Sequence, residues 1–117
     1  EIIAMYDEGL KDCNVELLKH FSDDCSSNGH LYMVRLLGKN EAERNRIIKQ
    51  MAQKGIATNV HFKPLPLLTA YKKMGFDIKD YPNAYAQYKN EITLPLHTLL
   101  MDEEVKYICT SLHQVIN

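Results

Sequence analysis

The sequence lacks the features that mark secreted, disulfide-bonded or membrane-spanning proteins. It has no tryptophan and only three cysteines, Cys13, Cys25 and Cys109, none of them in a Cys-x-x-Cys spacing. An odd number of cysteines without such a spacing supports neither a disulfide framework nor a zinc site, and it indicates reduced thiols in the cytoplasm. No apolar run approaches the roughly 20 residues that a membrane helix needs, and we find no secretory signal pattern. We therefore expect a cytoplasmic protein without a membrane partner.

An excess of charge of either sign is also missing. The chain has 14 lysines and arginines against 15 aspartates and glutamates, which gives a formal net charge of −1. A balanced charge provides no general attraction to nucleic acid or to an anionic membrane. The aromatic and basic strand motif of RNA-binding sheets is absent as well. We therefore expect no nucleic-acid partner.

Short catalytic and phosphate-binding motifs do not occur. The glycine-rich patterns GxGxxG and GxxxxGK[ST] are missing, as are GxSxG and HExxH. None of the five histidines forms a pair at positions i and i+4 of an expected helix, the simplest zinc arrangement. These absences predict no metal site and no glycine cradle for a phosphate.

The sequence does contain helical periodicity from its first residues. Ile2, Ile3, Tyr6 and Leu10 fall near one helical face, without a start methionine or a capping residue before them. An apolar helix face at the start of a chain needs another surface to cover it. The length of 117 residues suits one domain. We therefore expect residues 1–117 to be a single domain from a longer chain.

Short amphipathic segments follow, and they alternate between strand and helix patterns. We expect strands over 31–37, 56–62 and 92–96, and helices over 40–55, 67–75, 83–91 and from 102 onward. The economical architecture is a two-layer α+β fold, in which a small, mostly antiparallel sheet has helices on one side. The near-continuous apolar run over 31–37 suggests that both faces of that strand are covered. Its exception, Arg35, is expected to reach a carboxylate or solvent with its guanidinium group.

Two of the helices have recognisable boundaries and apolar stripes. Asn40 and Asp102 are the expected N-terminal caps, and Lys54 followed by Gly55 is a typical helix end. The stripe of the first of these helices is Ile47, Ile48, Met51 and Ala52. The stripe of the second is Val105, Ile108, Leu112 and either Val115 or Ile116.

The strand expected over 56–62 offers the best candidate for a functional residue. It has one apolar face and one small, polar face, and His61 lies on the polar face. Pro64 and Pro66 end the strand, because proline cannot donate to a sheet ladder. Functional groups are commonly presented at strand ends. The residues alone leave a structural and a functional role for His61 equally open, and His97 is a weaker candidate.

Four stretches, in order and at the expected spacing, resemble the C-terminal domain of the DegT/DnrJ/EryC1/StrS aminotransferases. They are "SSNGHLYMVRL", "GIATNVHFKPLPLLTAYKKMGF", "DYPNAYAQYKNEITLPLH" and "MDEEVKYI". These enzymes use pyridoxal phosphate, have the aspartate-aminotransferase fold type, and aminate keto-sugars carried on nucleotides for surface polysaccharides, lipopolysaccharides and antibiotics. The opening "MYDEGL" resembles the helix that joins the large and small domains of this family. Residues 1–14 are therefore expected to be that joining helix.

The resemblance implies a division of labour between two domains. The large domain, missing here, would carry the Schiff-base lysine and most cofactor contacts, so this chain would hold no catalytic or cofactor-binding residue and would be inactive alone. His61, Phe62 and Lys63 would form a wall of the substrate cleft, although Lys63 by itself is typical of a surface cation. Phe62 lacks the hydroxyl of the commoner tyrosine, and Pro66 replaces a histidine found in many members. A nucleotide-sugar substrate, glutamate as amino donor and a homodimer of the full-length protein are further implications.

A different class of function fits the residues without the resemblance. A free-standing α+β module for ligand sensing or subunit docking would need no cofactor and no catalysis. A lysine-bearing domain upstream in the same reading frame would distinguish the enzyme from this module.

Overall fold

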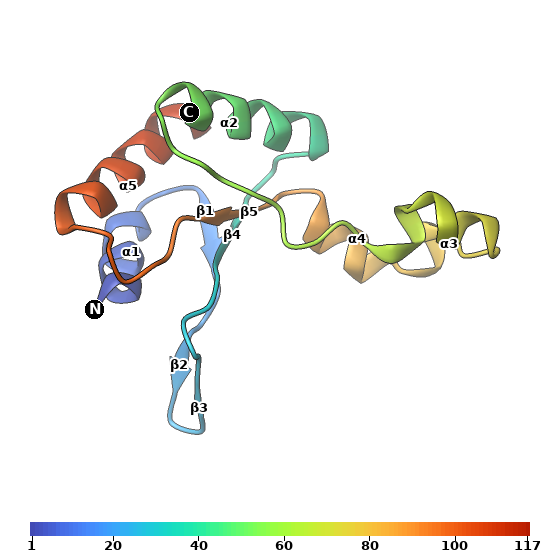
Figure 1. Cartoon of the computed structure of the whole chain (residues 1–117), viewed down its shortest axis with the longest axis horizontal. Coiled ribbons are helices and arrows are strands. Elements are labelled where there is room, and N and C mark those ends of the chain that lie inside the picture. Colours follow the sequence, from blue (N-terminus) through green and yellow to red (C-terminus); the bar gives the residue numbers. More distant parts are fainter.

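A three-stranded antiparallel sheet forms the centre of the structure, a computed structural model that describes residues 1–117 (Figure 1). Its strands are β1 (Val15–Leu17), β4 (Tyr32–Leu36) and β5 (Glu91–Leu94), in the spatial order β1-β4-β5. A separate hairpin of β2 (Phe21–Ser22) and β3 (Cys25–Ser26) extends away from the sheet. The predicted small antiparallel sheet is thereby confirmed. β5 lies at one edge of the sheet and ends just before Pro95, which has no N–H to donate to a ladder.

The helices form two groups in space (Figure 1). The first group is α1 (Ile2–Leu10), α2 (Glu41–Gln53) and α5 (Asp102–Ile116), which pack on one side of the sheet. The second group is α3 (Thr69–Lys73) and α4 (Pro82–Tyr88), with two short 3₁₀ turns, η1 (Leu65–Leu67) and η2 (Ile78–Asp80). This second group projects from the sheet on the right of Figure 1. None of the helices combines the length and apolarity that crossing a bilayer requires.

Alternation along β4 and β5 decides which face of the sheet is buried. Tyr32 pairs with Leu94 and Val34 pairs with Ile92, and all four side chains are buried against the helices. The helices contribute Tyr6, Leu10, Ile47, Met51, Val105, Ile108, Leu112 and Ile116 to the same core. The opposite face of β4 holds half-exposed residues, so the prediction that both faces of this strand are covered is wrong.

The predicted boundaries of α2 are confirmed. The Asn40 side chain accepts a hydrogen bond from the Glu43 N–H, and the Glu43 carboxylate accepts one from the Asn40 N–H. Gly55 has a φ of +77° after the last turn, a conformation that glycine adopts without strain. These two local signals fix the length of the helix.

One residue of the buried stripe of α2 was predicted wrongly. Ala52 is exposed, whereas Arg44 is buried with 1% exposure. Arg44 tolerates this position because its guanidinium group lies over the Tyr88 ring at 4.7 Å and donates to the Glu91 carbonyl at 3.4 Å. The buried arginine thus connects α2 with α4 and with the start of β5.

The start of α5 differs by one residue from the prediction. Met101 occupies the capping position, and its N–H donates to the Glu104 carboxylate at 2.9 Å. Asp102 is therefore the first helical residue, where its charge still suits the positive end of the helix. At the other end of the helix Ile116 is buried and Val115 only half-buried, which decides the alternative that the sequence left open.

The strand predicted over 56–62 does not form. Only Asn59 pairs with β5, through a single bridge to Thr93. The next two backbone N–H groups donate to side chains instead: that of Val60 to the Asn59 side chain at 2.8 Å, and that of His61 to the Glu91 carboxylate at 3.0 Å. With these donors used locally, no ladder continues along the edge of β5.

Candidate functional site

The face of the sheet that turns away from the helical core carries polar side chains. Glu16, Arg35 and Glu91 lie side by side across the three strands, and Thr93 follows two residues after Glu91 on the same face. Glu91 and Thr93 are nevertheless buried, with 1% and 6% exposure, because residues 59–61 bond to them. We define Glu91, Thr93 and His61 as the polar triad.

His61 is held in place by β5. Its backbone N–H donates to Glu91 Oε2 at 3.0 Å, and its Nδ1 lies 2.8 Å from Thr93 Oγ1. The Thr93 hydroxyl in turn donates to Glu91 Oε1 at 2.8 Å. Because the Asn59–Thr93 bridge fixes the same segment, the imidazole has a defined position although no regular strand carries it.

The carboxyl group of Glu91 is the buried ionisable group of the triad. Burial raises its pKa above the ordinary value. The hydrogen bonds from the Thr93 hydroxyl and the His61 backbone N–H limit this rise, as does the nearby positive charge of Arg44. The same donors that stabilise the carboxylate therefore position the histidine.

Phe62 and Lys63 differ from His61 in their surroundings. The Phe62 ring is 75% exposed and meets the His61 ring edge-on, with 4.7 Å between the ring centroids. Lys63 is exposed, and its side chain has neither a hydrogen bond nor an ion pair. The three residues predicted at the site thus combine one fixed imidazole with two groups that reach solvent.

An apolar projection follows directly after these residues. We define residues 64–85, which include α3 and the start of α4, as the arm. Its side chains enclose a hollow of about 370 Å³, lined by Pro64, Leu65, Pro66, Tyr71, Phe76, Tyr81 and Ala84. Pro66, for which the resemblance implies a histidine in many family members, adds apolar surface to this hollow. Next to the polar triad the chain therefore offers an apolar surface.

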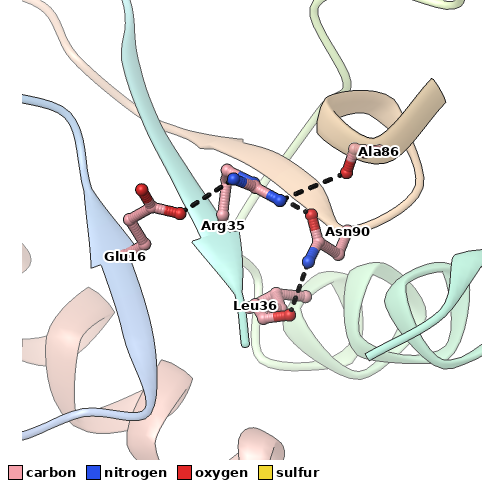
Figure 2. Close-up of polar contacts among 5 residues, drawn as sticks. All are labelled: Glu16, Arg35, Leu36, Ala86 and Asn90. Atoms are coloured by element: carbon pink, nitrogen blue, oxygen red, sulfur yellow. Dashed lines mark hydrogen bonds and ion pairs between the residues drawn. The ribbon is translucent and has the colours of Figure 1, made fainter. Parts of the chain in front are cut away.

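Arg35 connects the base of the arm to the sheet (Figure 2). It donates to Glu16 Oε2 at 2.9 Å, to Asn90 Oδ1 at 3.3 Å and to the Ala86 carbonyl at 3.3 Å. The Asn90 amide continues to the Leu36 carbonyl at 3.1 Å. The prediction that Arg35 reaches a carboxylate is confirmed. Its contact with the Ala86 carbonyl also links the sheet to α4, just after the arm.

Two other histidines have surroundings that the sequence did not reveal. His97 is exposed and lines a separate hollow of about 420 Å³ beside α5, to which His61 does not contribute. His20 is buried and stacks on Tyr32 with 5.3 Å between the ring centroids. An alternating pattern could not predict this burial, because His20 lies between β1 and the β2–β3 hairpin.

The lysines of the chain do not fit a pyridoxal-phosphate site. A lysine that forms a Schiff base needs to be desolvated beside the cofactor, and no lysine in this structure is buried. Lys39, Lys54 and Lys89 are half-buried, and all the others are exposed. Within this chain, no lysine therefore has the desolvated surroundings that a Schiff base needs.

Proteins of known structure resemble this chain along nearly its whole length. The protein Spr1654 of Streptococcus pneumoniae, described as a sugar aminotransferase and solved with pyridoxal phosphate, with pyridoxamine phosphate and without cofactor, matches 98% of this chain. The two share 51% sequence identity with a TM-score of 0.96, over 29% of the length of Spr1654. The fold is that of pyridoxal-phosphate aminotransferases of the aspartate-aminotransferase type. The chain belongs to the DegT/DnrJ/EryC1/StrS aminotransferase family, whose sequence profile matches residues 1–113.

Two curated relatives extend this comparison. A Helicobacter pylori UDP-4-amino-4,6-dideoxy-N-acetyl-beta-L-altrosamine transaminase is 33% identical over 95% of this chain and 29% of its own length. The spore coat polysaccharide biosynthesis protein SpsC of Bacillus subtilis is 26% identical over 99% of this chain and 31% of its own length. The chain therefore spans about 30% of the length of the relatives it matches.

Proposed function

We propose that this chain is the C-terminal domain of a pyridoxal-phosphate-dependent aminotransferase. Its reaction is the amination of a nucleotide-linked keto-sugar in surface polysaccharide or lipopolysaccharide biosynthesis in the cytoplasm. The observation that carries the proposal is the 51% identity and TM-score of 0.96 with Spr1654 over nearly the whole chain. The names of the Helicobacter and Bacillus relatives support a nucleotide-sugar substrate and a role in polysaccharide formation.

The chemistry of amino transfer belongs to the rest of the protein in this proposal. The cofactor, when bound by the large domain, supplies the group that carries the amine between glutamate and the keto-sugar, which no side chain can do. Residues 1–14 join the two domains, the full-length protein is a homodimer, and the 117-residue chain is inactive alone.

The role of this domain is to form one wall of the substrate cleft. His61 offers a fixed polar group, Phe62 an exposed aromatic ring, and Lys63 an unpaired positive charge. An imidazole can hydrogen-bond a sugar hydroxyl, an exposed ring can pack on a sugar or a base, and an ammonium group can approach a diphosphate. The three consecutive residues thereby match the mixed chemistry of a nucleotide sugar.

The test uses the full-length enzyme with a UDP- or dTDP-linked keto-sugar, glutamate and pyridoxal phosphate. Replacing His61 by alanine should raise the KM for the sugar nucleotide or lower kcat about tenfold, as expected for one or two lost polar contacts. The cofactor absorbance should not change. His30→Ala, at an exposed position on another segment, is the matched control. Unchanged kinetics for His61→Ala would remove His61 from the site, and a full-length protein without transaminase activity would overturn the proposal.

A further inference from the structure

The hydrogen bonds of the polar triad do more than hold the backbone of His61, because two of them form a chain from the imidazole through Thr93 to Glu91. A threonine hydroxyl has one proton to donate and lone pairs to accept with. In the structure the Thr93 hydroxyl donates its proton to Glu91 Oε1 at 2.8 Å. The same oxygen lies 2.8 Å from His61 Nδ1 and can then only accept there, so the proton of this hydrogen bond is on Nδ1.

The opposite arrangement is disfavoured by the second contact of Glu91. If Thr93 donated to the imidazole, its oxygen and Glu91 Oε1 would face each other at 2.8 Å without a proton between them, unless the carboxyl itself were protonated. Glu91 Oε2 also accepts the His61 N–H at 3.0 Å, and it lies near the positive charge of Arg44. Both contacts favour the carboxylate form, against the opposing effect of burial on the pKa of Glu91.

We propose that Glu91, acting through Thr93, is a positioning residue that fixes neutral His61 as the Nδ1–H tautomer. Nε2, which has no hydrogen-bond partner in the chain, is then the acceptor nitrogen. The inference deepens the proposed function and depends on it for the identity of the ligand. A neutral imidazole with a free Nε2 recognises a hydrogen-bond donor, such as a sugar hydroxyl or a base N–H, and not a phosphate oxygen.

The tautomer can be measured without any substrate. The full-length enzyme is labelled with ¹⁵N-histidine, and ring nitrogens are recorded by long-range ¹H–¹⁵N correlation at pH 8, where an ordinary histidine is neutral. The His61 signals are assigned by their loss in His61→Ala. We expect Nδ1 at the protonated ¹⁵N shift and Nε2 at the unprotonated one. The reverse pattern, or averaged shifts for both nitrogens, would overturn the inference.

Variants separate positioning from a merely structural role. Thr93→Val removes the hydroxyl at nearly constant volume, and Glu91→Gln removes the charge; in both, the His61 shifts should move towards a mixture of tautomers. Thr98→Val, on an exposed threonine, should leave them unchanged. If Thr93→Val keeps the wild-type pattern while its amide spectrum shows a folded protein, Thr93 does not set the tautomer. If Thr93→Val does not fold, Glu91→Gln provides the same comparison.

Kinetics then connect the tautomer to recognition. Thr93→Val should raise the KM for the sugar nucleotide about fivefold with kcat within twofold, the size expected for one neutral hydrogen bond. A fixed Nδ1–H tautomer combined with normal kinetics in His61→Ala would refute the substrate role and leave the positioning inference intact. A different tautomer in the wild-type enzyme, combined with impaired kinetics in His61→Ala, would refute the positioning inference and leave the substrate role of His61 intact.

Discussion

The close contact between α1 and α5 leads to a prediction whose size can be worked out from the structure. A Cβ atom added at Gly9 would lie 2.7 Å from the Sγ atom and 3.2 Å from the Cβ atom of Cys109. Overpacking of this kind costs about 1–3 kcal/mol, whereas alanine is better than glycine in a helix interior by about 1 kcal/mol. We therefore expect Gly9→Ala to destabilise the chain by about 1 kcal/mol, although alanine is the better helix former.

A double-mutant cycle tests the cause of this effect. In the Cys109→Ala background the sulfur contact is gone and only the 3.2 Å contact remains, which a small shift relieves. Gly9→Ala should then be neutral or stabilising, with an interaction energy of about 1–2 kcal/mol between the two positions. The measurement is urea unfolding followed by circular dichroism. If Gly9→Ala stabilises the wild-type chain by the full helix-propensity gain, the two helices do not pack as closely as described.

Three further predictions concern the polar groups and thiols. Because burial raises the pKa of Glu91 in the folded state, its contribution to stability is fully present below the unfolded-state pKa of about 4.3 and is lost as the pH rises through the folded-state pKa. In urea titrations, wild type should therefore lose stability relative to Glu91→Gln as the pH rises above about 4. A stability difference that does not change with pH, or that shifts in favour of wild type, would contradict this. Burial, with the neighbouring Cys13 as a smaller cause, raises the pKa of the Cys109 thiol to about 11. A thiol reagent at pH 8 should therefore modify exposed Cys25 rapidly and Cys109 only after unfolding. Equal modification rates would argue against the packing of Cys109. Arg35→Ala should speed amide hydrogen exchange in residues 82–88 but not in 105–116, because it removes the contact to the Ala86 carbonyl; equal acceleration in both segments would indicate general destabilisation instead.

Much of the fold could be predicted because local signals and burial agree. The capping box at Asn40, the glycine stop at Gly55 and the apolar stripe of α5 all depend on residues close in sequence. The burial of Arg44 could not be predicted. Its ion pair with Glu41, three residues earlier, is local, but the Tyr88 ring and the Glu91 carbonyl that complete its surroundings lie more than 40 residues away in the chain. Long-range polar partners leave no trace in hydrophobic periodicity.

In the candidate site, too, local sequence signals could be predicted and long-range contacts could not. A polar position before a proline-rich exit selected His61 as a candidate, and the family resemblance suggested the role that we propose for it. Glu91 and Thr93 were missed, although they alternate with buried Ile92 and Leu94 and so had a readable period of two. The predicted strand over 56–62 failed for a related reason: its alternation is real, but side chains took the backbone donors that a ladder needs.

The single bridge between Asn59 and Thr93 also affects how the molecule resists aggregation. A bare outer strand invites another chain to add to it. On β5 that position is occupied at Thr93 by the Asn59 backbone, and its neighbour Glu91 is covered by the turn that bears His61. A foreign strand would have to displace the segment that bears His61 before it could pair with β5, so this segment also protects that edge of the sheet from strand addition.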